Sequence, residues 1–291
     1  MHKPITTLLL AVCALLPAYI NAGQNLVCSK TSVAPTVDGL SVDIAWQSAS
    51  NTTTPDETAP ISHTLHCVYD KDRIYIKADF KDMTESRTHA TSIWSSDDGW
   101  YKQLADREDT LLLKWNMDDN QGDLSLSSDT AYRADVWYWK AFRTDPVGYA
   151  DDKSHIFSNL PMKKAKKYIS KSGNRFFLVR RGDKGVSAYK PIIHVRHTGS
   201  DTEPSYEHRE PAGSRADIKA KGHWQNNTWT VEFSRALDTG NPDDVRFKTN
   251  RKYQLGVSRY EIGGRSLNEP SNNPLHGTGE IDRTLTLLFE Q

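Results

Sequence analysis

Cysteine and methionine are scarce in this chain of 291 residues, with three and four copies respectively. Three cysteines are too few for a protein held together by a disulfide framework. Beyond residue 22 no segment approaches the run of about 18 apolar residues that reads as a membrane-crossing helix, so we expect no membrane span. The 37 basic residues balance 37 acidic ones, and a net charge of +0 gives no whole-molecule attraction to nucleic acid.

Sequence motifs of the common enzyme classes are also absent. We find no Cys-x-x-Cys-His for covalent haem, no glycine-rich phosphate loop, no Gly-x-Ser-x-Gly and no His-Glu-x-x-His. The adjacent pairs Asp151-Asp152 and Asp243-Asp244 are the nearest approach to an acid/base dyad. Neighbouring residues on a strand point to opposite faces, so turn and cap roles are the better interpretation of both pairs. We therefore expect no catalytic activity of the chain's own.

The first 22 residues have the pattern of a secretory signal peptide. Lys3 supplies the positive charge, residues 5–16 the apolar segment, and Ala22 a small residue before the cut. We expect residues 23–291 to form a single domain that is periplasmic or secreted. In such an oxidising compartment Cys28 and Cys67 are expected to form one disulfide, with reactive thiols or metal ligation as the alternatives.

Short β-rich runs separated by turn signals dominate the remaining sequence. Two hairpins are predicted around the turns at residues 70–72 and 225–227, and residues 196–215 read as a long polar loop. The pattern predicts an all-β fold, a single two-sheet β-sandwich with short helices in its loops. The predicted strands cover residues 65–69, 73–80, 110–115, 135–143, 175–180, 189–195, 216–224, 228–234, 253–259 and 285–289.

Aromatic residues are plentiful, with 8 Trp, 12 Tyr and 8 Phe, and they are densest in residues 135–143. With the period of two of a strand, Trp137 and Trp139 share one face while Tyr138 and Phe142 share the other. A strand that is aromatic on both faces either packs between two layers or lines a cavity for a flat ligand. The sequence leaves both interpretations open.

Three segments resemble known families. Residues 33–46 (VAPTVDGLSVDIAW) are similar to the opening of sandwich domains in the DOMON and family-9 carbohydrate-binding group. Residues 134–152 (ADVWYWKAFRTDPVGYADD) and 213–240 (GSRADIKAKGHWQNNTWTVEFSRALDTG) resemble the haem-binding domain of the ethylbenzene dehydrogenase gamma-subunit family, which also occurs in periplasmic cytochrome proteins. The resemblance extends over most of residues 33–289.

The resemblance implies one non-covalent haem b per chain, with its iron held by a methionine and a lysine. It also implies electron exchange with a molybdenum oxidoreductase or a cytochrome. A lysine ligates iron only after losing its proton, which requires a desolvated pocket. Carried onto this chain, the family pattern makes five residues candidates for contact with the haem: Trp137, Trp139 and Lys140 on its wall, and Tyr149 and Asp152 closing it.

The candidate iron ligands are fewer. Met117 is the methionine nearest to the tryptophan-rich strand, Lys219 and Lys221 lie on the strand that matches the lysine-bearing one, and His276 is an alternative near the C-terminus. The expected function is haem b electron transfer. The alternative is a non-haem carbohydrate- or small-ligand-binding module of the same sandwich type, in which Trp137 and Trp139, or Trp94 and Trp100, stack on the ligand.

Overall fold

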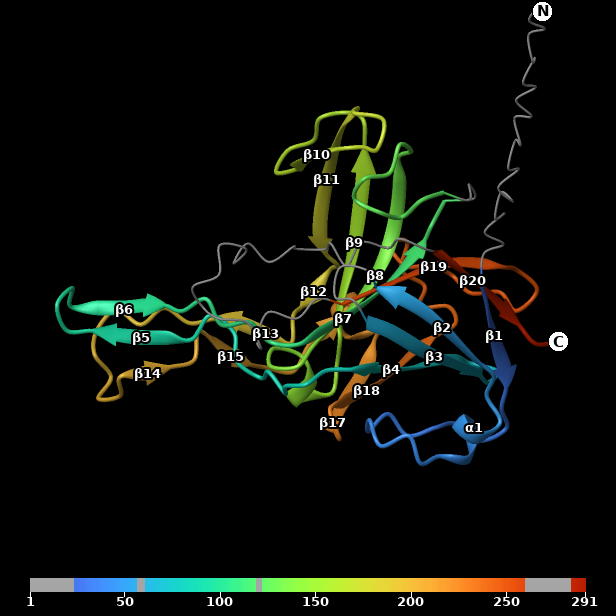
Figure 1. The fold of residues 1–291 in the computed structure, drawn as a ribbon, viewed down its shortest axis with the longest axis horizontal. Helices are drawn as coiled ribbons and strands as arrows, with labels where there is room; N and C mark the ends of the chain where they lie inside the picture. The colour runs from blue at the N-terminus through green and yellow to red at the C-terminus, as the bar shows by residue number, and fades with distance from the viewer. Residues whose placement is uncertain (1–23, 57–60, 119–121, 260–283) are drawn as a thin grey trace, which may run out of the picture.

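The computed structural model describes residues 24–56, 61–118, 122–259 and 284–291 (Figure 1). Helices are confined to single turns in the loops: α1 (Ile44–Gln47), η1 (Asp145–Val147) and η2 (Ser214–Ala216). The prediction of an all-β chain with short loop helices is confirmed. Within the described ranges, no helix combines the length and the hydropathy that a bilayer crossing requires.

One sheet of 13 strands makes up most of the molecule. Its strands are β1 (Asn25–Lys30), β2 (Asn51–Asp56), β3 (Ile61–Tyr69), β4 (Arg73–Lys81), β7 (Thr110–Asn116), β8 (Tyr132–Lys140), β9 (Asp151–Ser158), β10 (Lys166–Ile169), β11 (Arg175–Gly182), β17 (Lys219–Gln225), β18 (Thr228–Ala236), β19 (Tyr253–Ser258) and β20 (Thr284–Phe289). They are hydrogen-bonded in the order β10-β11-β9-β8-β7-β19-β20-β1-β3-β4-β18-β17, with β2 beside β3.

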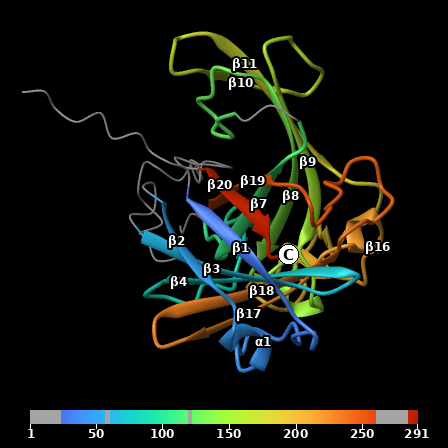
Figure 2. The ribbon, with the colours of Figure 1, turned by 90° about the vertical axis from the view of Figure 1, so that its right-hand side faces the viewer.

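The sheet folds back on itself, so that its two halves face each other across one core. Leu113 of β7 and Trp137 of β8 belong to the same buried cluster as Ile76 of β4 and Phe233 of β18. In Figure 2, β7, β8 and β9 stand above the layer that contains β3, β4, β17 and β18. This arrangement confirms the predicted β-sandwich, which buries the apolar face of each half against the other.

Besides the large sheet there are three small ones, two of which form an arm on one side of the sandwich, at the left in Figure 1. The three consist of β5 (Ser92–Ser95) with β6 (Trp100–Gln103) and β14 (Thr202–Glu203), of β13 (Tyr189–Pro191) with β15 (Tyr206–His208), and of β12 (Gly185–Val186) with β16 (Ala212–Gly213). Residues 196–215, predicted as a long polar loop, contain three short strands, β14, β15 and β16, between connecting segments. These strands have only two or three residues each, too few for an alternating pattern, and β14 pairs with β5 more than a hundred residues away.

Two predicted strands also end earlier than expected. The strand expected over residues 135–143 stops at Lys140, because the amide of Thr144 donates to the carbonyl of Lys140 at 3.1 Å and the chain turns into η1. The strand expected over residues 189–195 stops at Pro191.

Cys28 and Cys67 are register partners on the parallel strands β1 and β3, and a disulfide of 1.98 Å joins them. Both lie in the core at 0% exposure. Since β1 also pairs with β20, the disulfide lies where the two halves of the large sheet meet.

Candidate functional site

The tryptophan-rich strand β8 is buried on both faces. The ring centroid of Trp137 lies 5.3 Å from that of Trp115, and the centroid of Trp139 lies 4.9 Å from that of Trp229. Val136, on the other face, packs in a second apolar cluster. Trp137 and Trp139 are 0% exposed and have protein neighbours on their rings. The strand therefore packs between two layers, which is one of the two interpretations that the sequence left open. Their contact with a haem stays a prediction.

Lys140 lies in a buried network of charges. Its Nζ donates to the carboxylate of Asp151 and, at 2.8 Å, to the hydroxyl of Tyr189. Burial lowers the pKa of Lys140 to about 8, and the charge of Asp151 only partly opposes this effect. Burial by itself would raise the pKa of Asp151, but the charges of Lys140 and of Arg215, whose Nη2 donates at 2.5 Å, contribute to holding it below its usual range.

Lys140 also lines a pocket of about 290 Å³ that is rich in cations and aromatic rings. The Nζ atom of Lys140 lies 4.6 Å from the ring centroid of Tyr138, and the Arg143 guanidinium lies 5.2 Å from that of Tyr189. The charge of Lys140, followed by burial, lowers the pKa of Lys153 to about 8. Such a pocket is suited to an anionic group.

Tyr149 and Lys219 lie together, as backbone bridge partners between the β8–β9 connection and β17. The Lys219 Nζ atom lies 3.4 Å from the ring centroid of Tyr149, while the Tyr149 hydroxyl donates to Glu210 at 2.7 Å. Burial, with Glu210 adding to it, raises the pKa of Tyr149 to about 12. Partial burial lowers the pKa of Lys219, but its side chain is exposed, whereas an iron-binding lysine needs a desolvated pocket.

Lys221 and His276 are the two other candidates for the second iron ligand. The Lys221 ammonium donates to the backbone carbonyl of Asp145 at 2.9 Å and lies 3.4 Å from the carboxylate of the same residue. His276 lies outside the described residues. Both stay predictions as iron ligands.

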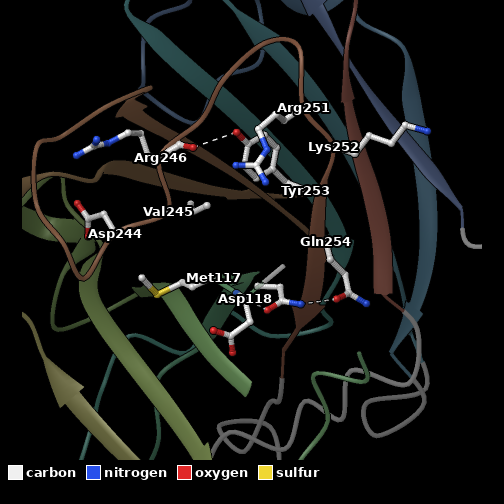
Figure 3. A pocket seen from close by; sticks show the side chains of 10 residues that line it. Met117, Asp118, Asp244, Val245, Arg246, Arg251, Lys252, Tyr253 and Gln254 are labelled. Atoms are coloured by element: carbon white, nitrogen blue, oxygen red, sulfur yellow. Dashed lines mark hydrogen bonds between the residues drawn. The ribbon is translucent and has the colours of Figure 1, made fainter. Parts of the chain in front are cut away.

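Met117 follows β7 directly and lies between two pockets. The first, of about 270 Å³, is shown in Figure 3, where the thioether points into the space below the segment that carries Asp244 and Val245. The second, of about 360 Å³, is lined by Met117 together with Arg133 and Lys184. Lys219 lines a third pocket, of about 570 Å³. The structure therefore places Met117 and Lys219 in different pockets.

Asp152 points toward three other aspartates beneath β8. One carboxylate oxygen from each of Asp135, Asp152 and Asp244 lies within 4.8 Å of the others. Burial raises the pKa of Asp152 well above its usual value, and the neighbouring carboxylates add to the rise. The same causes raise the pKa of Asp135 to about 6 and that of Asp183 to about 7. The contact of Asp152 with a haem stays a prediction.

The sequence did not reveal this cluster. Asp151-Asp152 and Asp243-Asp244 were considered only as adjacent pairs, and the structure separates the members of the first, with Asp151 bonded to Lys140 and Asp152 beside Asp135. Asp152 from the first pair and Asp244 from the second then lie together in the cluster. An aspartate within an otherwise aromatic strand was the signal available in the sequence, because a charged residue on a buried face requires a partner.

Comparison with known proteins places the chain in context. Two solved structures with similar chains are family-9 carbohydrate-binding modules from Caldicellulosiruptor kristjanssonii, one in complex with cellotriose and one with glucose. Each is 10% identical with a TM-score of 0.40, and the matches cover 92% of this chain and 95% and 97% of those chains. No curated protein matches the sequence. The family model described as ethylbenzene dehydrogenase matches residues 38–266, and the chain therefore belongs to the ethylbenzene dehydrogenase family.

Proposed function

We propose that this protein binds haem b without a covalent link and transfers electrons to or from a redox partner. Membership of the ethylbenzene dehydrogenase family supports the proposal, because that family is associated with an oxidoreductase. The observation that carries it is the position of Met117, whose thioether lines two pockets. When bound, a haem would supply one-electron redox chemistry, with a potential set by its axial ligands and its surroundings.

The residues around Met117 fit such a group. A thioether is a soft donor, and methionine is an established axial ligand of haem iron. Cationic side chains line the pockets on either side, Arg246 and Arg251 in one and Arg133 and Lys184 in the other, and they would face the carboxylates of a haem. Each pocket also has two aspartates in its lining, which would have to lie away from those carboxylates. We therefore propose Met117 as one ligand. Lys219, Lys221 and His276 remain the candidates for the second.

Haemin titration with visible spectroscopy tests the proposal. The wild-type protein is expected to develop a Soret band and a low-spin spectrum, and Met117→Leu to lose the low-spin features while keeping its fold. Met83→Leu is the matched control, because that side chain is 74% exposed and lines none of these pockets. A wild-type protein that stays colourless would refute haem binding, and an unchanged Met117→Leu spectrum would refute the ligand.

The redox partner belongs to the same proposal. We propose a molybdenum oxidoreductase or a cytochrome as the partner, since the family is tied to an oxidoreductase. The Cys28–Cys67 disulfide supports an oxidising compartment, periplasmic or extracellular, for the encounter. Stopped-flow reduction of the haem-loaded protein by a periplasmic oxidoreductase fraction would test this directly, with Met117→Leu as the comparison.

A second candidate function is non-haem binding of a carbohydrate or another small flat ligand. The observation in its favour is the β5–β6 hairpin, where Trp100 is 56% exposed and Trp94 lies 4.8 Å, between centroids, from the ring of His197. Trp137 and Trp139 are buried and offer no such face. Titration with cello-oligosaccharides, followed by tryptophan fluorescence, should show saturable quenching that Trp100→Ala abolishes. The absence of quenching in the wild-type protein would reject this function.

A further inference from the structure

Four aspartates converge beneath β8 from four separate segments of the chain. Asp135 lies on β8, Asp152 on β9, Asp183 just after β11, and Asp244 in the loop after β18. Oxygens of three of them lie within 4.8 Å of one another. The fourth, Asp183, adjoins them, since its backbone amide donates to the carbonyl of Asp152 at 3.2 Å. All four are buried, with at most 7% exposure.

Several of the cluster's carboxylate oxygens lack an ordinary hydrogen-bond donor. Both oxygens of Asp152 and both of Asp183 are buried with no partner other than each other's carboxyl, and Oδ1 of Asp135 and of Asp244 accept no hydrogen bond from an N–H or hydroxyl group of the described residues. Asp152 is 0% exposed, so bulk water does not compensate it. Buried polar atoms in folded proteins nearly always have a partner, and an ionised carboxylate without one is costly. Carboxyls that face one another need either a shared proton, which the raised pKa values of Asp152 and Asp183 favour without metal, or a cation between them.

The cation already present in the cluster is insufficient. Arg235 is 0% exposed, donates to Oδ2 of Asp135 and to the carbonyl of Val245, and lies 4.0 Å from Oδ1 of Asp244. One guanidinium beside four carboxylates leaves an excess of negative charge in a low-dielectric interior. Within the described part of the chain, Arg235 makes no hydrogen bond or ion pair with the carboxylates of Asp152 and Asp183.

We propose that the carboxylates of Asp135, Asp152, Asp183 and Asp244 bind a divalent cation of the calcium class. Carboxylate oxygens are hard donors, and Ca²⁺ takes about 6–8 of them in flexible geometry. Mg²⁺ usually keeps several waters and demands an octahedral site, which suits an enclosed all-carboxylate cluster less well. The ion would join β8, β9 and the loop after β18. This inference does not depend on the proposed function.

Calcium titration of the purified protein, after removal of metal with EDTA, tests the proposal. Calcium is expected to raise the Tm of the wild-type protein by about 5–10 °C at about 100 times its Kd. Tb³⁺, a luminescent substitute for Ca²⁺, should show emission on excitation of tryptophan. Trp137 is the expected donor, because it is the register partner of Asp152 and its ring centroid lies 4.9 Å from the Arg235 guanidinium.

The decisive variant is Asp152→Asn. It removes one of several like charges, so we expect it to raise the Tm of the metal-free protein while weakening calcium binding at least about 10-fold. Asp183→Asn serves the same purpose if the first variant fails to fold. Asp238→Asn is the matched control, because its side chain is 53% exposed and pairs with Arg246 outside the cluster.

Three outcomes would overturn the inference. One is a wild-type Tm that does not change up to about 10 mM Ca²⁺, ten times the weak end of extracellular calcium modules. The second is unaltered calcium affinity in Asp152→Asn and Asp183→Asn, which would place the bound ion elsewhere. The third is tighter binding of Mg²⁺ than of Ca²⁺. Loss of the calcium-dependent Tm shift in the aspartate variants, with its retention in Asp238→Asn, would support the site.

Discussion

The disulfide between Cys28 and Cys67 gives the sharpest quantitative test of how the sandwich is held together. The two residues are 39 apart in sequence, and closing a loop of that size removes chain entropy worth about 4 kcal/mol from the unfolded state. Both side chains are 0% exposed in the core, so truncation to alanine adds a packing loss of about 1 kcal/mol for each. We expect Cys28→Ala to lower the free energy of unfolding by about 5 kcal/mol.

The double variant carries the reasoning further. Once Cys28→Ala has broken the bond, adding Cys67→Ala should cost only the second packing loss, about 1 kcal/mol. Guanidinium unfolding, followed by tryptophan fluorescence, measures each free energy. No reductant is added, because it would open the wild-type disulfide in the unfolded chain, and a low protein concentration limits pairing between chains. Amide exchange should also accelerate in β1, the strand between the two halves of the sheet. If the double variant loses the sum of the two single losses, the cross-link is not the source of the stability.

The other predictions concern the core and a buried histidine. At Gly222 a Cβ would lie 2.3 Å from the Trp139 ring, so we expect Gly222→Ala to lower the free energy of unfolding by about 1–3 kcal/mol. Adding Trp139→Phe to the same chain should recover part of that loss. A double-mutant cycle measures the coupling, and strictly additive losses would contradict the prediction. Burial, aided by the charge of Lys114, lowers the pKa of His155 well below 6.5, so below about pH 6.5 the unfolded state binds a proton that the folded state does not. The free energy of unfolding should therefore decrease as the pH is lowered below about 6.5, by up to about 1.4 kcal/mol per pH unit. Urea unfolding at several pH values should show a flatter slope for His155→Phe. Equal slopes would show that another group is responsible.

Much of the fold follows from local sequence signals. The hairpin turn at residues 70–72 and the alternating runs on both sides of it predicted β3 and β4 to within a few residues, since turn chemistry and side-chain alternation act over short distances. The apolar run at residues 110–115 likewise became β7, which is buried along its whole length. The strands of residues 196–215 were missed because each has only two or three residues, and the partner of one of them, Ser92 for Glu203, lies more than a hundred residues away.

For the candidate site, too, the sequence determined some features and the tertiary structure decided others. By itself the sequence determined the strand periodicity, the family motifs and Met117 as a candidate ligand. Only the tertiary structure decided that Trp137 and Trp139 pack into the core, that Met117 and Lys219 line different pockets, and that Asp152 meets Asp135 and Asp244. The physical reason is register: β8, β9 and the loop after β18 bring together side chains up to about a hundred residues apart, and local patterns carry no record of which carboxylates will share one buried space.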